Sequence, residues 1–268
     1  MTIQISKVCI VLIFSCAILS AQDKSALPKL TAKSALTVDV KTGAVLFSKN
    51  VDEKRSVAST QKLLTGLIIA ESGDLDNMVM VEKTDGMVTP RNLWITAGSR
   101  YEKGKLLEVM LVRSYNDVAK CLARDHSASQ GNFAKVMQAK AIELGMKNSV
   151  FKTAHGLTVE GQHSTASDMM ILARACWVNP EIRKIVETKK TTFTYQGGKT
   201  IEIENSNELI HSYAECVGMK TGYTESAGCC LIAAAKRGDK EVLAVILGSS
   251  WEGVWTDAEL VLKWSLNQ

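Results

Sequence analysis

The sequence predicts an α+β fold in which one antiparallel sheet is built from both ends of the chain, with helices between them. Two short strand patterns joined by a Lys-Thr-Gly turn occupy residues 35–49. Helical patterns fill the middle of the chain, and three further strand patterns follow residue 216. Those three strands are joined by short turns, so we expect them to pair antiparallel.

The first 21 residues have the pattern of a cleaved export signal. Lys7 supplies a positive charge, an apolar run of about a dozen residues follows it, and Ala21 precedes a polar Gln-Asp pair. Such a run is too short to span a membrane comfortably. Cys16 offers an alternative, a lipoprotein signal, but Phe14 fits that motif poorly. We therefore expect an exported chain, periplasmic or secreted and soluble after cleavage at Ala21.

After a lead-in at 22–33, we expect a single domain over 34–268. Its helices carry recognisable boundaries. The segment 105–127 reads as two helices broken near Ser114. An amphipathic helix pattern at 132–146 is closed by Gly145, and the helix pattern at 165–178 has Thr165 or Ser167 as its N-cap. The other expected elements are a buried helix at 59–72, a hairpin at 191–205, strands at 216–224, 229–237 and 241–250, and a closing helix at 256–267.

Composition limits the kinds of partner. The chain has 268 residues and a net charge of +4, and its basic residues are scattered, so we expect no nucleic-acid partner.

Histidine, cysteine and tryptophan residues give no sign of a metal or sugar site. His155 and His163 lie in loops without an acidic partner pattern, so we expect no metal. The cysteines after the signal fit neither a C-x-x-C nor a zinc-ribbon spacing and read as small buried thiols: Cys121, Cys176, Cys216, Cys229 and Cys230. We expect Trp251, Trp255 and Trp264 to be packing residues rather than a sugar platform.

Ser59 and Lys62 are the first candidates for chemistry. A serine and a lysine at positions i and i+3 share one helix face, so the amine can reach the hydroxyl. A serine hydroxyl needs a base to become a nucleophile, and a buried lysine with a lowered pKa can be that base. At a helix start, Ser59 also meets free N–H groups that favour a developing oxyanion.

Each motif taken alone is weak. Ser149 and Lys152 repeat the Ser-x-x-Lys spacing, Ser-x-Asn begins at Ser48, Ser114 and Ser265, and Lys-Thr-Gly begins at Lys41 and Lys220. Context separates the copies. Ser59 precedes a buried helix, Ser114 breaks a helical region, and Lys220 opens a strand, whereas Lys41 lies in a hairpin turn.

Taken in that order, the three motifs resemble those of the penicillin-recognising serine enzymes. Five segments narrow the resemblance to the serine D-alanyl-D-alanine carboxypeptidases, the low-molecular-mass penicillin-binding proteins of peptidase S11 type. They include "SVASTQKLLTGLI", "SYNDVAKCLA", "KNSVFKTAHGL", "HSTASDMMILAR" and "VGMKTGYTESAGCCLIAAAKR". The resemblance implies a β-lactamase/transpeptidase-like fold, with a five-stranded antiparallel sheet flanked by helices and a helical subdomain. Relatives commonly continue into a C-terminal β-domain and a membrane anchor, and we expect neither beyond the single catalytic domain at 34–268.

The resemblance also implies catalytic roles. Ser59 would attack the carbonyl between the two terminal D-alanines of a peptidoglycan stem peptide, and Lys62 would take its proton as general base. Ser114 would relay a proton to the departing D-alanine. Lys220 would keep the site electropositive and attract the terminal carboxylate. Water would then release the acyl-enzyme, with no cofactor, and β-lactams would act as inhibitors of a monomeric enzyme.

Four further residues would bind the substrate in such an enzyme. Asn116 would bond the substrate or the base, Thr221 would bond the carboxylate, and Gly222 belongs to the same strand. The backbone N–H groups of Tyr223 and of the nucleophile would form the oxyanion hole.

The chain departs from the family pattern at three positions. Val57 replaces a usual proline, Tyr115 replaces a small residue and would narrow or reshape the groove, and Val254 stands where many members carry an arginine.

Two alternatives stay open, and the first shares the same three motifs. A class A-like β-lactamase would need a deacylating glutamate, and Glu160 lacks the expected surroundings. A non-catalytic penicillin or peptidoglycan sensor is the other alternative.

Overall fold

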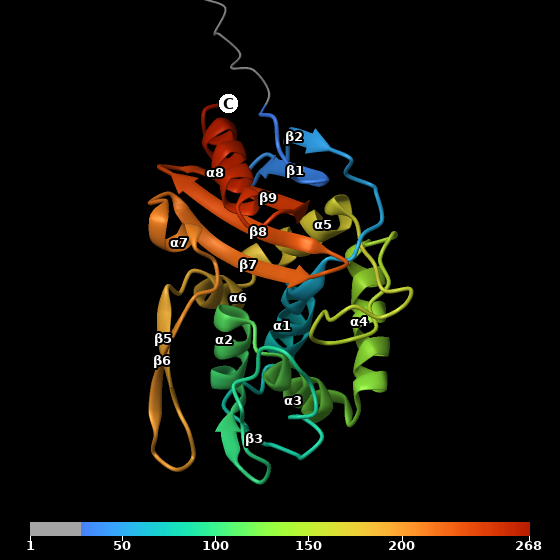
Figure 1. Ribbon diagram of the computed structural model, residues 1–268, viewed down its shortest axis with the longest axis vertical. Coiled ribbons are helices and arrows are strands. Elements are labelled where there is room, and N and C mark those ends of the chain that lie inside the picture. Colours follow the sequence, from blue (N-terminus) through green and yellow to red (C-terminus); the bar gives the residue numbers. More distant parts are fainter. Residues whose placement is uncertain (1–27) are drawn as a thin grey trace, which may run out of the picture.

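A five-stranded antiparallel sheet forms the upper part of the molecule in Figure 1, in the order β2-β1-β9-β8-β7. It pairs β1 (Ser34–Asp39) and β2 (Val45–Lys49) from the start of the chain with β7 (Cys216–Thr224), β8 (Gly228–Arg237) and β9 (Lys240–Ser249) from its end. The predicted sheet, built from both ends of the chain, is therefore confirmed.

The structure is a computed structural model that describes residues 28–268. The expected signal peptide and the first part of the lead-in lie outside the described residues. Within the described part of the chain, no helix is both long enough and apolar enough to cross a membrane.

The sheet is covered on both faces, as the continuous apolar runs of its central strands require. On β9, Val242, Ala244 and Ile246 pack under α8 (Gly253–Leu266), the expected closing helix. The residues between them belong to the larger core shared with the other helices. Figure 1 shows α8 on one side of the sheet and α5 (Ala166–Val178) on the other.

The helical part lies below the sheet in Figure 1 and centres on α1 (Lys62–Glu71). Every residue of α1 from Lys62 to Ile69 is buried, which fits a helix that is apolar on all sides. Around it stand α2 (Lys103–Arg113), α3 (Asn116–Ser127) and α4 (Gln130–Leu144). Gly145 closes α4 at φ +87°, and Thr165 caps α5 by accepting a hydrogen bond from the Asp168 N–H, both as expected.

The expected hairpin is formed by β5 (Lys190–Thr194) and β6 (Thr200–Glu204), and it projects from the lower left of the molecule in Figure 1.

Several other short elements had no clear sequence signal. The elements that periodicity did not reveal are β3 (Met78–Met80), β4 (Arg100–Glu102), α6 (Pro180–Val186) and α7 (Leu209–Ser212). Segments of three to seven residues are too short to display a period.

The five cysteines expected in the mature chain are all buried and free, which confirms their interpretation as packing thiols. Burial raises the pKa of these thiols, and that of Cys230 reaches about 12.

Candidate active site

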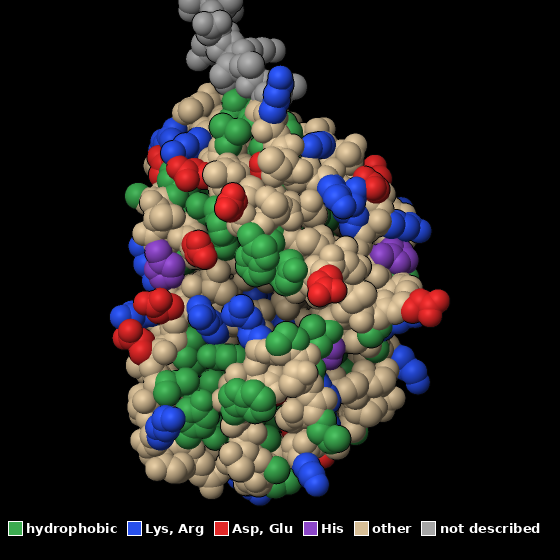
Figure 2. Space-filling view, viewed as in Figure 1, with side chains coloured by type: hydrophobic (Ala, Val, Ile, Leu, Met, Phe, Trp, Pro, Cys, Tyr) green, Lys and Arg blue, Asp and Glu red, His purple; other side chains and the backbone are tan. Residues whose placement is uncertain are grey.

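A cavity of about 590 Å³ lies between strand β7 and the helical part of the molecule. Figure 2 shows a hollow across the middle of this face, with Lys and Arg side chains gathered at it and hydrophobic side chains above and below. Six of the eight expected functional residues line the cavity: Ser59, Ser114, Asn116, Thr221, Gly222 and Tyr223. The other two, Lys62 and Lys220, are almost fully buried.

Ser59 lies in η1 (Ala58–Gln61), a single 3₁₀ turn, because α1 itself begins three residues later than expected. The preceding Ala58 is held at φ +49°, a region that side-chain-bearing residues rarely adopt. Two glycines press against this turn. A Cβ atom on Gly222 would lie 2.8 Å from the Ser59 nitrogen, and one on Gly156 would lie 2.2 Å from the Ala58 carbonyl oxygen. Only glycine allows β7 and the 154–157 loop to approach the serine this closely.

The amine of Lys62 lies against the Ser59 hydroxyl. Nζ is 2.8 Å from Ser59 Oγ, 2.7 Å from Asn116 Oδ1 and 2.6 Å from the His155 carbonyl oxygen. The Ser59 hydroxyl itself lies 3.2 Å from that carbonyl oxygen. The i, i+3 spacing predicted the first of these contacts, and the other two join segments far apart in the sequence.

The corner between α2 and α3 presents Ser114 and Asn116 to the cavity. Ser114 ends α2 in the left-handed conformation, at φ +73°, and Tyr115 is extended, so the chain turns within two residues. The Asn116 amide donates to the Pro90 carbonyl at 2.6 Å, and its oxygen accepts from Lys62. Tyr115 packs against the main core and is not among the residues that line the cavity.

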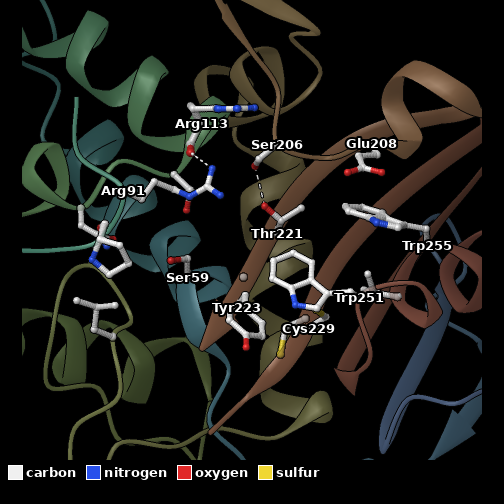
Figure 3. A pocket seen from close by; sticks show the side chains of 17 residues that line it. Ser59, Arg91, Arg113, Ser206, Glu208, Thr221, Tyr223, Cys229, Trp251 and Trp255 are labelled. Carbon is white, nitrogen blue, oxygen red and sulfur yellow. Dashed lines mark hydrogen bonds between the residues drawn. The ribbon is translucent and has the colours of Figure 1, made fainter. Parts of the chain in front are cut away.

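Strand β7 forms the opposite wall, and Lys220 lies in its middle rather than at its start. Lys220 Nζ donates to the Thr221 carbonyl at 3.1 Å, and the Thr221 hydroxyl is 2.6 Å from that of Ser206. Beyond them, the Tyr223 ring packs against Trp251 at 4.5 Å between centroids. Figure 3 shows Thr221 facing Ser206, and the Tyr223 ring beside Trp251.

Both lysines have lowered pKa values. Burial is the main cause for Lys62, whose pKa lies well below its ordinary value, and the charges of Lys220 and Arg91 lower it further. Burial, followed by the charge of Arg91, lowers the pKa of Lys220 to about 7. The pKa of His155 falls to about 3 because the ring is removed from water beside Lys62.

The second copies of the motifs lie elsewhere and have structural roles. The Ser149 hydroxyl donates to Asp168 at 2.6 Å, and the Lys152 amine donates to the Glu160 carbonyl at 2.7 Å. Ser265 bonds Thr37 inside the core. Lys41 is exposed in the turn between β1 and β2.

Sequence reasoning missed several residues of the cavity. Arg91 and Arg113 line it opposite α8, and no spacing rule linked them to the motifs. Trp255 and Trp264 pack against the core under α8, as expected, and Trp255 also lines the cavity. Trp251 is 59% exposed and lines the cavity, so the expectation that it is a core-packing residue was wrong. The backbone carbonyl of His155 could not be found at all, because a carbonyl has no sequence signature.

Comparison with known proteins adds independent evidence. The model of the peptidase S11 family, D-alanyl-D-alanine carboxypeptidase, matches residues 21–250. The chain is 35% identical over 224 residues to the D-alanyl-D-alanine carboxypeptidase DacF of Bacillus subtilis. The matched region covers 82% of this chain and 58% of DacF. The chain is 30% identical over 244 residues to DacB2 of Mycobacterium tuberculosis, covering 89% and 83% respectively. The chain thus spans less than two thirds of the length of the first of these relatives.

Solved structures of similar fold belong to the same group of proteins. A Streptomyces DD-transpeptidase superposes with a TM-score of 0.85 at 26% identity, covering 90% of this chain and 99% of that one. DacD of Francisella tularensis superposes with a TM-score of 0.84 at 25% identity, covering 89% and 71%. Since the family model matches most of the sequence, and the β-lactamase/transpeptidase-like fold agrees with it, this chain belongs to the D-alanyl-D-alanine carboxypeptidase family, peptidase S11.

Proposed function

We propose that the chain is a serine-type carboxypeptidase that removes the terminal D-alanine from peptidoglycan stem peptides ending in D-Ala-D-Ala. The observation that carries the proposal is the contact between Ser59 Oγ and the amine of a buried lysine, Lys62, at 2.8 Å. A desolvated lysine beside other cations favours its neutral form, which can accept the serine proton.

In the acylation step, the Ser59 oxygen attacks the carbonyl carbon between the two D-alanines while its proton passes to Lys62. The backbone N–H groups of Ser59 and Tyr223 bind the resulting oxyanion, which is where such donors contribute most. Ser114 relays a proton to the leaving nitrogen, the C–N bond breaks, and free D-alanine departs. The close fit of Gly222 against η1 supports this arrangement, because it brings the β7 backbone up to the nucleophile.

Substrate binding falls to the β7 wall in this proposal. Lys220 attracts the terminal carboxylate, Thr221 donates its hydroxyl to it, and Asn116 holds both the lysine base and the substrate amide. A water molecule then attacks the ester carbonyl with the same base, which regenerates Ser59. Every step uses side chains and water, so the proposal includes no cofactor.

A class A-like β-lactamase is less well supported. Such an enzyme needs a carboxylate that activates the deacylating water close to the serine. Glu160 is exposed and does not line the cavity. We therefore expect a long-lived penicilloyl adduct. A non-catalytic sensor would form the adduct but release no D-alanine.

The test is to incubate the mature protein with a pentapeptide ending in D-Ala-D-Ala and, separately, with a penicillin. We expect release of D-alanine and a stable adduct on Ser59. Ser59→Ala should lose both, and Ser149→Ala, the matched control, should keep both. Rapid penicillin turnover without release of D-alanine would support the β-lactamase, and an adduct mapped to Ser149 would contradict the assignment of the nucleophile.

The finer localisation is also part of the proposal. Its support is the sequence pattern of residues 1–21, which predicts export and cleavage after Ala21. N-terminal sequencing of the exported chain is the direct test. A first residue of Gln22 agrees with it, and a lipid on Cys16 would show that the signal is of the lipoprotein type.

A further inference from the structure

The cavity holds more cationic groups than the three motifs account for. Arg91 and Arg113 both line it, and neither forms an ion pair with a carboxylate among the described residues. Together with buried Lys62 and Lys220 they face a single acidic lining residue in the described chain, Glu208. An excess of unpaired cations around a cavity favours a ligand that carries negative charge.

The walls of the cavity differ in charge. The wall from α8 and the segment before it offers Trp251, Val254 and Trp255, none of which is charged. Arg91 enters from the other side, and Figure 3 shows its guanidinium group directed into the cavity between Ser59 and Thr221. In the same view the guanidinium group lies beside Thr221 and Ser206, whose hydroxyls are 2.6 Å apart. The charge of Arg91 acts on both Lys62 and Lys220, which places it near the two buried amines of the site.

The backbone fixes Arg91 in this direction. Residue 91 is held at φ +62°, a conformation that costs energy for a residue with a side chain. Its carbonyl accepts the Asn116 N–H at 2.9 Å, and its guanidinium donates to the Arg113 carbonyl at 3.4 Å. The side chain is therefore tied to the α2–α3 corner that also presents Ser114 and Asn116.

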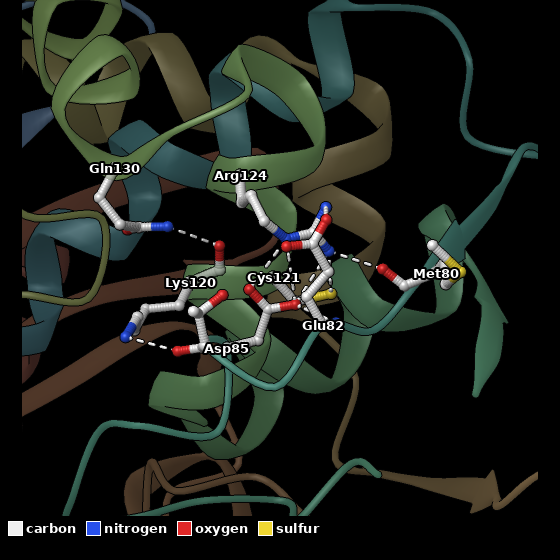
Figure 4. Close-up of polar contacts among 8 residues, drawn as sticks. Met80, Glu82, Asp85, Lys120, Cys121, Arg124 and Gln130 are labelled. Atoms are coloured by element: carbon white, nitrogen blue, oxygen red, sulfur yellow. Dashed lines mark hydrogen bonds and ion pairs between the residues drawn. The ribbon is translucent and has the colours of Figure 1, made fainter. Parts of the chain in front are cut away.

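The loop that carries Arg91, residues 81–99, is pinned to α3 on both sides of it. After Arg91, the Asp117 carboxylate accepts the N–H groups of residues 93, 94 and 95 at 3.0, 2.8 and 3.4 Å. Before Arg91, Arg124 pairs with buried Asp85 at 2.9 Å, and Lys120 donates to the carbonyls of Thr84 and Met87, as Figure 4 shows in part. Anchoring on both sides holds the guanidinium in place before a ligand arrives, which reduces the entropy lost on binding.

We propose that Arg91 binds the terminal carboxylate of the substrate, together with Lys220 and Thr221, and so gives the enzyme its preference for peptides with a free C-terminus. A planar guanidinium group can donate two parallel hydrogen bonds to a carboxylate, which a lysine cannot. The inference rests on the proposed function for the identity of the substrate, but the recognition of a carboxylate beside Ser59 can be measured without it.

The experiment compares ligands that differ only in that group. Wild type, Arg91→Gln and Arg91→Lys are assayed with a peptide ending in D-Ala-D-Ala and with its C-terminal amide, and separately for acylation by a penicillin and by its methyl ester. We expect the preference for the acid over the neutral ligand to fall about 10- to 100-fold in Arg91→Gln and by less in Arg91→Lys. Arg100→Gln, an exposed arginine in β4, is the control and should keep the preference.

The preference is the ratio of the rates with the acid and with the neutral ligand, measured for one variant at one pH. A change in the basicity of Lys62 alters both rates by the same factor, so it cancels in the ratio. Loss of Arg91 also raises the pKa of Lys220, which makes that lysine more charged and reduces the expected loss, so the measured change is a lower limit. A purely structural role for Arg91 would lower both rates together and leave the ratio unchanged, and that result in both variants would overturn the proposal. Wild type that is acylated by penicillin but releases no D-alanine would instead overturn the proposed function while the penicillin arm still tested Arg91.

Discussion

The protonation state of Lys62 decides what it can do for Ser59. An ammonium group has three N–H donors, whereas a neutral amine has two donors and one lone pair. Asn116 Oδ1 and the His155 carbonyl oxygen can accept only, and they lie 2.7 and 2.6 Å from Nζ. With both N–H groups of a neutral amine occupied there, its lone pair would be left for the Ser59 hydroxyl. In the proposed mechanism these two acceptors would therefore orient the base as well as bind it.

We expect Lys62→Ala to lose most acylation, on the order of 10²- to 10⁴-fold, because a general base contributes about that much. Lys41→Ala, in the exposed Lys-Thr-Gly turn, should be nearly silent. The rate of labelling by a fluorescent penicillin measures both.

The same rate in the wild type should depend on pH. Because burial and neighbouring cations lower the pKa of Lys62, the neutral base predominates above that pKa, and acylation of the wild type should fall as the pH drops through it. A flat rate from mildly acidic to alkaline pH, or equal losses in the two variants, would contradict the role.

At the scale of single residues, the sequence predicted what local spacing can encode. The i, i+3 pair of Ser59 and Lys62 is a property of any helical turn, so it could be expected before the structure. The His155 carbonyl and the Arg91 guanidinium could not, since each reaches the site through a loop whose path depends on contacts far away in the sequence. Trp251 was misread for a similar reason: a tryptophan has the same sequence signal whether it packs in a core or lines a cavity.

At the scale of elements, helix α3 organises the cavity although it contributes only Asn116 to its lining. Asp117 in its first turn holds residues 93–95, and Arg124 in its last turn holds Asp85. The two contacts lie on either side of Arg91 in the loop. Neither was predicted, because a long loop without periodicity gives no information on where it docks.

We expect Arg124→Met to destabilise the fold by about 3 kcal/mol, because Asp85 is only 1% exposed and would be left as a buried, unpaired carboxylate. Acylation should fall as well, since the loop that bears Arg91 would lose one anchor. The free energy of unfolding in urea measures the first effect. Lys190→Met removes an exposed ion pair with Glu202 and should leave the unfolding midpoint unchanged. If the two variants unfold at the same urea concentration, the Asp85 contact does not hold the loop.

Element type was predictable where a pattern was long. Three strands after residue 216, the paired helices at 105–127 and the helix closed by Gly145 were all confirmed. The start of α1 was placed too early, because Ser59-Thr60-Gln61 forms a 3₁₀ turn with the same local spacing as a helix. That difference matters for function, since the tighter turn is what Gly156 and Gly222 pack against.

At the scale of the whole molecule, the cavity lies where the sheet meets the helical part. Ser59 and Lys62 come from the junction of η1 and α1, Ser114 from the α2–α3 corner, and Lys220 from β7. Bringing them together buries two lysines, and neither has a carboxylate within ion-pair distance in the described chain. Burying an amine without such a partner lowers the free energy of unfolding, whether the amine stays charged or gives up its proton. The arrangement that lowers the pKa of both lysines therefore reduces the stability of the fold.

Lys220→Met should therefore make the protein more stable and less active. The pKa of Lys220 is about 7 in the folded chain and near 10.4 when unfolded, so between these values the unfolded state holds more protons and the stability of the wild type rises with pH. Methionine fills a similar volume without a charge, so we expect a gain on the order of 2–4 kcal/mol near pH 7. Above pH 7 the folded chain has already lost this proton, and the cost of removing it on folding falls as the pH approaches the pKa of the unfolded chain, so this gain should shrink steadily toward pH 10. Lys41→Met, in the exposed turn, should change neither stability nor its pH dependence. Urea unfolding of all three proteins across this pH range measures the difference, and a gain that stays constant with pH would show that the charge of Lys220 is not what the fold resists.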